Sequence, residues 1–360
     1  MGRIYNFSAG PSVLPEEVLH QAGSEIMDYK GSGMSVMEMS HRSKVYEEII
    51  HNTEALFRSV LEIPENYKVL FLQGGATMQF AMVPMNLLGK NGRADYVITG
   101  NFSTKAYEEA LLFGKQISVA ATTKAENFSR IPEQGELKLD PQADYVHICS
   151  NNTIFGSTWK YIPDTGDVPL VADMSSCILS EPVDVARYGI IYAGAQKNIA
   201  PAGLSIAIVR EDLLRSPLPG TPVMLNYAVQ AKNESMYNTP PCWPIYIAML
   251  VLEWIQGLGG LSAMQQRNRE KATILYEYLD STDFYKTDIV PRDRSMMNVT
   301  FTTGDAELDA ALVKECTAAG MVNLKGHKSV GGLRASIYNA MPKAGVESLV
   351  AFMADFEKRK

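Results

Sequence analysis

Val168-Pro169-Leu170-Val171-Ala172-Asp173 is an apolar run that ends in a carboxylate and is followed by the small polar stretch Met174-Ser175-Ser176. Such a run predicts a buried strand of an α/β fold. In an open α/β sheet the ligand crevice lies at the carboxyl ends of the strands, so we expect Asp173 to project into it. The alternative is that Asp173 only caps the helix that follows.

The next apolar run, Tyr188 to Ala193, leads into Gly194-Ala195-Gln196-Lys197-Asn198 and then into another apolar strand. Lys197 is therefore expected at the same edge of the sheet as Asp173. Desolvation there would lower the pKa of its amine and make it a usable nucleophile. An arbitrary loop lysine is usually solvated, but the carboxylate on the neighbouring strand favours a functional role for Lys197.

Short apolar runs alternate with longer helical segments from residue 16 to 265, which predicts an α/β domain with a mostly parallel sheet. A Gly-Leu-Gly-Gly break at 257–260 precedes a smaller α+β pattern. We expect an N-terminal arm (1–15) that joins the small domain, a large domain (16–265) and a small C-terminal domain (266–360). The seven expected strands are Lys68–Leu72, Asp95–Thr99, Gln116–Val119, Tyr145–Cys149, Leu170–Ala172, Ile190–Ala193 and Ser205–Val209, and the main helices are Pro15–Tyr29, Val45–Leu61, Met78–Leu87, Ile245–Leu258 and Glu347–Glu357.

Composition limits the possible functions. The 360 residues are 46% hydrophobic and 20% charged, and the net charge of −7 comes without basic clusters, so we expect neither nucleic acid nor a membrane as partner. The N-terminus does not resemble a secretion signal, and we expect a cytoplasmic protein. The four cysteines are widely spaced, which predicts neither a disulfide framework nor a metal site.

One cofactor matches the remaining pattern. Pyridoxal phosphate requires a lysine, a carboxylate against its ring nitrogen, a donor array for its phosphate and a flat side chain against its ring. Gln73-Gly74-Gly75-Ala76-Thr77 follows a strand and opens a helix, where backbone N–H groups and the Thr77 hydroxyl can hold a phosphate. Phe102 and Thr153 follow other strands, where they could stack on the ring and donate to its phenolic oxygen.

Six motifs, in this order along nearly the whole chain, resemble the phosphoserine aminotransferase family. They are Asn6-Phe7-Ser8-Ala9-Gly10-Pro11, Met39-Ser40-His41-Arg42-Ser43, Gln73-Gly74-Gly75-Ala76, Ala172-Asp173-Met174-Ser175-Ser176, Gly194-Ala195-Gln196-Lys197-Asn198 and Gly332-Leu333-Arg334-Ala335-Ser336-Ile337-Tyr338-Asn339-Ala340.

This resemblance implies a fold-type-I pyridoxal-phosphate transferase that forms a homodimer with shared active sites. It implies that Lys197 holds the cofactor covalently, that Asp173 pairs with the ring nitrogen and that Phe102 stacks on the ring. The remaining implied cofactor contacts are Ala76, Thr77, Gln196 and Thr153, with Asn238 and Thr239 of the partner subunit, and the implied substrate contacts are His41, Arg42, His327 and Arg334. His41 and His327 could instead be structural histidines.

The implied reaction is a ping-pong amino transfer between L-glutamate and 3-phosphohydroxypyruvate, which gives O-phospho-L-serine for serine biosynthesis. A phosphorylated four-carbon 2-oxo acid of pyridoxine biosynthesis is a second implied substrate. Some family members carry Trp at Phe102, and some carry Arg at Thr77, where it reaches the substrate phosphate.

Three alternatives remain open. A small-residue aminotransferase or a cysteine desulfurase would share the fold, although Cys177 lies too close to Asp173 to act as a mobile nucleophile. A nucleotide-binding or structural protein is disfavoured because GxxxxGK[ST] and GxGxxG are absent.

Overall fold

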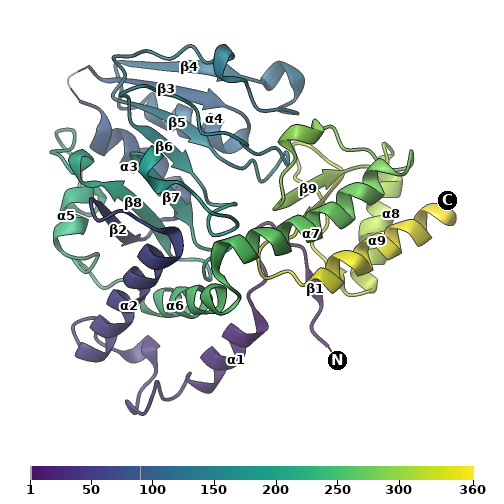
Figure 1. Ribbon diagram of the computed structural model, residues 1–360, viewed down its shortest axis with the longest axis horizontal. Coiled ribbons are helices and arrows are strands. Elements are labelled where there is room, and N and C mark those ends of the chain that lie inside the picture. Colours follow the sequence, from purple (N-terminus) through teal and green to yellow (C-terminus); the bar gives the residue numbers. More distant parts are fainter. Residues whose placement is uncertain (1, 90) are drawn as a thin grey trace.

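The computed structural model describes residues 2–89 and 91–360, which form a large part built on one sheet and a smaller C-terminal part (Figure 1). The sheet has seven strands in the order β2-β8-β7-β6-β5-β3-β4. All seven expected strands are present, and the sheet is mostly parallel as predicted, with only β8 running against its neighbours. Their bounds are β2 (Tyr67–Leu72), β3 (Arg93–Ile98), β4 (Gln116–Thr122), β5 (Tyr145–Cys149), β6 (Leu170–Asp173), β7 (Ile190–Gly194) and β8 (Ser205–Arg210).

Helices cover both faces of this sheet. Leu170 and Ala172 of β6 pack into a cluster with α2 (Lys44–Leu61) and α6 (Cys242–Gly257). Val171 faces the opposite cluster, which contains α3 (Gly75–Leu87), α4 (Asn101–Ala110) and α5 (Tyr227–Lys232). Burial on both faces explains why the central strands are continuous apolar runs.

The first helix is shorter than predicted. We expected it over Pro15–Tyr29, but α1 spans Glu16–Ser24. Lys30, Gly31 and Gly33 all have positive φ, and the Tyr29 N–H donates to Met34 O at 3.0 Å. The helix thus ends at Ser24, with Glu25 as its C-cap, and the chain then turns back on itself between Tyr29 and Met34.

The C-terminal part has its own core. β9 (Asn298–Phe301) pairs antiparallel with β11 (Leu333–Ser336), and β1 (Tyr5–Asn6) pairs parallel with β10 (Met321–Val322). Three helices complete it: α7 (Gly260–Asp280), α8 (Ala306–Ala318) and α9 (Lys343–Lys358).

Helix α7 bridges the two parts. Met264 belongs to the core of the large part, whereas Ala272 and Leu275 belong to the C-terminal core. The division proposed at residue 265 therefore falls inside a continuous helix. It remains a proposal, as does the assignment of residues 1–15 to the small domain.

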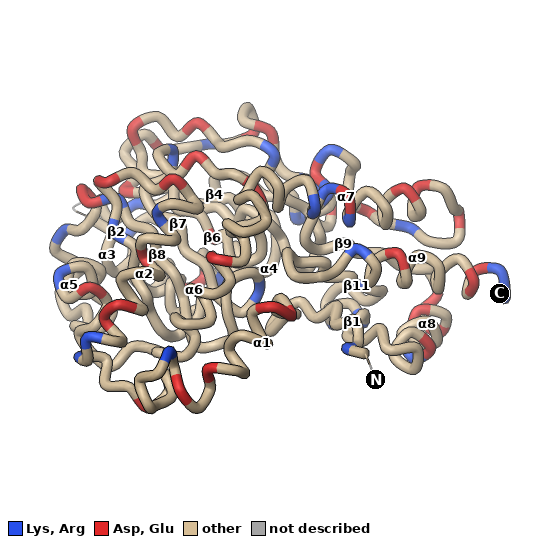
Figure 2. The backbone as a smooth tube through the Cα atoms, turned by 60° about the horizontal axis from the view of Figure 1, so that its bottom comes forward, with Lys and Arg blue, Asp and Glu red and all other residues tan. Residues whose placement is uncertain are grey.

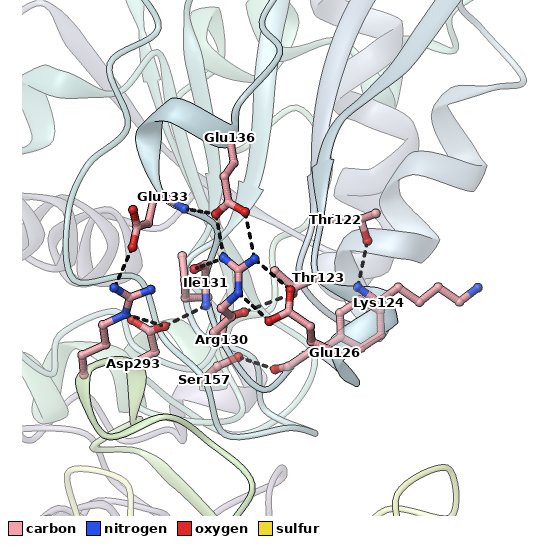
Figure 3. Close-up of polar contacts among 12 residues, drawn as sticks. Thr122, Thr123, Lys124, Glu126, Arg130, Ile131, Glu133, Glu136, Ser157 and Asp293 are labelled. Carbon is pink, nitrogen blue, oxygen red and sulfur yellow. Dashed lines mark hydrogen bonds and ion pairs between the residues drawn. The ribbon is translucent and has the colours of Figure 1, made fainter.

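A second connection between the two parts is an ionic cluster. Figure 3 shows Arg130, Glu126, Glu136 and Glu133 of this cluster, and its fifth member is Arg292. Arg130 contacts Glu126 and Glu136, each at 2.6 Å, and Arg292 contacts Glu133 at 2.7 Å. The neighbouring Asp293 accepts a hydrogen bond from the backbone N–H of Ile131 at 2.9 Å. Because residues 292 and 293 lie between α7 and β9, the cluster fastens that segment to a loop of the large part.

Acidic and basic residues are interspersed over both parts (Figure 2). Within the described ranges, no single helix combines the length and the apolar composition needed to span a membrane. Helices α6 and α7 have the required length and composition only when they are taken together, and the two are bent by 83° relative to each other.

Candidate active site

Parallel strands bring the predicted site residues together. Asp173 is the last residue of β6 and pairs in register with Cys149 of β5 and Tyr192 of β7. Lys197 lies in the turn after β7, at the same edge. One cavity at this edge is lined by seven predicted residues, namely Ala76, Thr77, Phe102, Thr153, Asp173, Gln196 and Lys197.

Asp173 is a buried carboxylate whose side chain is held by the turn that follows it. Its Oδ1 accepts from the Ser175 backbone N–H at 2.9 Å, and the Ser175 hydroxyl accepts from the Gly194 N–H at 3.0 Å. Burial raises the pKa of Asp173, while the Ser175 hydrogen bond and the charge of Lys197 oppose that rise. A positively charged ring nitrogen in the cavity would further favour the ionised carboxylate.

Lys197 is a buried amine close to the groups it would need. Its Nζ donates to the Thr153 hydroxyl at 2.8 Å and lies 5.3 Å from the centre of the Phe102 ring. Burial lowers the pKa of Lys197, and the nearby Asp173 partly opposes this. An amine with a lowered pKa is unprotonated more often near neutral pH, which makes it a better nucleophile and base.

The start of α3 has the geometry expected of an anion site. Gly74 caps the helix with φ of 85°, and a Cβ placed there would lie 2.6 Å from the Met78 Cβ. Glycine at this position thus permits a tight turn that leaves the first N–H groups of the helix free to bind a phosphate. The lysine, carboxylate, ring-stacking face and helix terminus of this cavity all fit pyridoxal phosphate.

The C-terminal part adds positive charge beside the cavity. Arg334 on β11 donates to the Thr153 carbonyl at 3.2 Å. His327 contacts the Ser329 hydroxyl at 2.7 Å, and Asn101 at the start of α4 donates to that hydroxyl at 3.2 Å. Burial lowers the pKa of His327, and the positive charges of Arg334, Lys328 and Lys105 lower it further.

Comparison with known proteins agrees with this geometry. Residues 4–349 match the family model described as aminotransferase class-V. A phosphoserine aminotransferase from Nitrosomonas europaea is 55% identical, over 99% of this chain and 99% of its own. The chain belongs to the phosphoserine aminotransferase family.

Solved structures support the same assignment. Phosphoserine aminotransferase from Bacillus circulans subsp. alkalophilus has a TM-score of 0.97 and 49% identity, over 99% of each chain. The pyridoxal-phosphate-bound enzyme from Trichomonas vaginalis has a TM-score of 0.94 and 41% identity, over 98% of this chain and 100% of its own. The resemblance found in the sequence and the pyridoxal-phosphate cofactor are thus confirmed, and the chain is an aminotransferase.

Six predicted site residues do not line this cavity. Two of them, His327 and Arg334, lie in the C-terminal part as described above, and the other four lie elsewhere. His41 and Arg42 lie between the η1 turn (Val36–Glu38) and α2, and Arg42 is exposed. Asn238 and Thr239 are exposed in the loop before α6, where the Thr239 carbonyl accepts from Gln73 at 3.3 Å. Their roles in a site shared between subunits stay predictions.

The sequence analysis assigned no role to four residues that lie near Lys197 in the structure. Ser175, Ser176 and Asn151 follow strands β6 and β5, so the position of small polar residues just after a buried strand could have identified them. Ser12 donates to the Lys197 carbonyl from 185 residues away in sequence. No local pattern marks such a contact.

The free cysteines disfavour a desulfurase. Burial raises the pKa of Cys149 and of Cys177 above that of an ordinary thiol, and Asp173 raises both further. The thiolate is the nucleophilic form, so neither residue is activated for attack.

Proposed function

We propose that this enzyme transfers the amino group between L-glutamate and 3-phosphohydroxypyruvate, giving 2-oxoglutarate and O-phospho-L-serine for serine biosynthesis. A phosphorylated four-carbon 2-oxo acid is a further candidate substrate. The observation that carries the proposal is the position of Arg334 and His327 beside the cavity that contains Lys197 and Asp173. Substrates with a carboxylate at one end and a second anionic group fit that arrangement.

Asp173 and Lys197 have different roles in the proposed reaction. Pyridoxal phosphate, when bound, accepts the electron pair that the substrate Cα–H bond leaves behind. The Asp173 carboxylate holds the proton on the ring nitrogen, which keeps the ring electron-poor. The Lys197 amine would hold the cofactor, and as a free amine it would act as the base that takes the substrate Cα proton and passes it to the cofactor.

Recognition of the substrate is assigned to the cationic groups. The Arg334 guanidinium suits the substrate carboxylate, because its two parallel N–H groups match the two carboxylate oxygens. Thr77 supplies no charge at the position where some relatives carry Arg. We therefore assign the substrate phosphate to His327, together with His41 and Arg42.

The proposed working form is a homodimer in the cytoplasm. Exposure of Asn238, Thr239 and Arg42 in the single chain supports the dimer, because these polar groups would gain partners across an interface. The free state of all four cysteines supports a reducing compartment.

Subunit complementation tests the shared site. Lys197→Ala and an Asn238/Thr239 double alanine variant should each be inactive or nearly so. A refolded mixture should recover one working site per heterodimer, or about a quarter of wild-type activity if the chains pair at random. A mixture no more active than its parents would show that each site is built within one chain.

A coupled assay tests the reaction itself. L-Glutamate is supplied with either 3-phosphohydroxypyruvate or hydroxypyruvate, and release of 2-oxoglutarate is measured. The proposal predicts that kcat/KM is larger for the phosphorylated acid by about 100-fold or more, because two or more charge-assisted hydrogen bonds are lost without the phosphate. Equal kcat/KM values for the two acids would overturn the substrate assignment but not the transamination chemistry.

A further inference from the structure

The N-terminal motif Asn6 to Pro11 carries no role in the mechanism above, yet the chain around it contacts the most reactive residue. Within the N-terminal arm, the segment around Phe7 is anchored in the C-terminal core. Phe7 is fully buried there, its N–H donates to Val322 O at 3.0 Å, and its carbonyl accepts from the Ser336 N–H at 3.3 Å. Asn6 also accepts from the Asn323 side chain at 2.8 Å.

The other end of the arm lies on Lys197. The Ser12 backbone N–H donates to the Gln196 carbonyl at 3.0 Å, and the Ser12 hydroxyl donates to the Lys197 carbonyl. Gly10 lies beside the Lys197 side chain, where an added Cβ would be in van der Waals contact with its Cγ at 3.4 Å. Two successive carbonyls of the lysine turn are therefore held by one arm residue.

A second contact, from the C-terminal part, also holds the lysine turn. The Asn198 side-chain oxygen accepts from the Asn339 backbone N–H at 3.1 Å. Lys271 of α7 donates to the carbonyls of Ile337 and Tyr338 at 3.0 and 2.7 Å, and Tyr338 in turn donates to the Ala9 carbonyl at 2.8 Å. The arm and the segment after β11 thus form one connected support around Lys197.

We propose that Ser12 is a positioning residue, through which the N-terminal arm fixes the Lys197 backbone relative to the C-terminal core. Lys197 has a long side chain with many rotamers, so the reach of its amine depends on where its backbone is held. Reacting groups must be placed within about 0.5 Å for efficient proton transfer. The inference rests on the proposed function only for the role of Lys197.

Hydrogen exchange of the holoenzyme tests this independently of activity. Backbone amides of Ala195, Ile199 and Ala200 are bonded within the lysine turn. In Ser12→Ala, peptides covering 194–204 should exchange about threefold faster or more. Ser12→Thr, which keeps the hydroxyl, should restore protection. Ser348→Ala is the matched control, since it removes another hydroxyl-to-carbonyl bond, to Ala344 on the exposed side of α9, and should behave as wild type.

Kinetics provide a second measurement. Ser12→Ala should lower kcat by about fivefold or more with KM little changed, because the substrate contacts remain while the lysine is misplaced. Wild-type exchange in Ser12→Ala would overturn the proposal, and so would a Ser12→Thr variant that behaves like Ser12→Ala. If no aminotransferase activity were found in any form, the exchange result would still decide the role of Ser12.

The anchored end of the arm has its own control. Phe7→Leu and Phe356→Leu each alter a fully buried phenylalanine of the same core and should lower the melting temperature by similar amounts. Only Phe7→Leu should also speed exchange of peptides covering 194–204. Equal exchange of these peptides in the two variants would show that anchoring of the arm in the C-terminal core does not affect the Lys197 backbone.

Discussion

The ionic cluster around Arg130 and the cavity around Lys197 use charge in opposite ways. In the cluster, Arg130 has two carboxylate partners at 2.6 Å, and the glutamate side chains are 43% and 47% exposed (Figure 3). The pairing raises the pKa of Arg130 and lowers that of Glu136 to about 2, so each group is held more firmly in its charged form.

In the cavity, burial acts on groups that lack such close pairing. The pKa of Asp173 is raised and that of Lys197 is lowered, so both move toward their neutral forms. The difference shows which charges are available for chemistry. A fully paired surface charge stabilises structure, whereas a buried group poised between protonation states can exchange a proton or bind a charged ligand.

The largest expected effect comes from removing the charge of Asp173. Asp173→Asn should lower kcat by about 10³-fold or more, because an amide cannot keep the ring nitrogen protonated. Cofactor should still bind, since the phosphate site at α3 is untouched. Steady-state rates and the cofactor absorption band should be measured together. The structure has a turn and no helix directly after Asp173, so a variant within a few-fold of wild type would leave Asp173 only the structural role of accepting the Ser175 N–H in that turn.

An intermediate effect is expected at His327. Its pKa is lowered in the free chain, so the ring is mostly neutral at pH 7, and a bound phosphate dianion should raise that pKa and draw a proton onto it. Binding of the phosphorylated substrate therefore takes up a proton and should weaken as pH rises. His327→Ala should raise KM for 3-phosphohydroxypyruvate by about tenfold and flatten its pH profile, with KM for glutamate changed much less. Equal losses for the two substrates would make His327 structural.

The smallest effect is expected in the ionic cluster. Arg130→Met should lower the melting temperature by at most a few degrees, because exposed ion pairs contribute little and their carboxylates remain hydrated when unpaired. The difference from wild type should shrink further at about 1 M salt. Melting curves at low and high salt, with kcat as a control, check this. A large loss of kcat in Arg130→Met would contradict the separation between structural and chemical charges.

Much of this architecture could be predicted from local sequence. Six of the seven strands are buried apolar runs, the exception being the edge strand β4, and parallel topology then places Asp173 and Lys197 at one edge. The end of α1 was mispredicted: the helix ends at Ser24 with Glu25 as its C-cap, and the positive-φ turn at Lys30 and Gly31 follows only after Tyr29. The contact of Ser12 with Lys197 joins residues that are 185 positions apart, so it depends on the tertiary fold and could not be predicted from local spacing in the sequence.

The central claim is that the buried amine of Lys197 is the one that binds pyridoxal phosphate. Lys271 is the sharpest internal comparison, because it is also buried and burial lowers its pKa to about 7, yet its amine donates to backbone carbonyls of residues 337–339 instead of facing the cavity. Borohydride reduction of the holoenzyme, followed by peptide mapping, locates the modified lysine. We expect the visible cofactor band to disappear and the label to lie on Lys197, with none on Lys271. A label on Lys271 or on any other lysine, with Lys197 unmodified, would contradict the assignment.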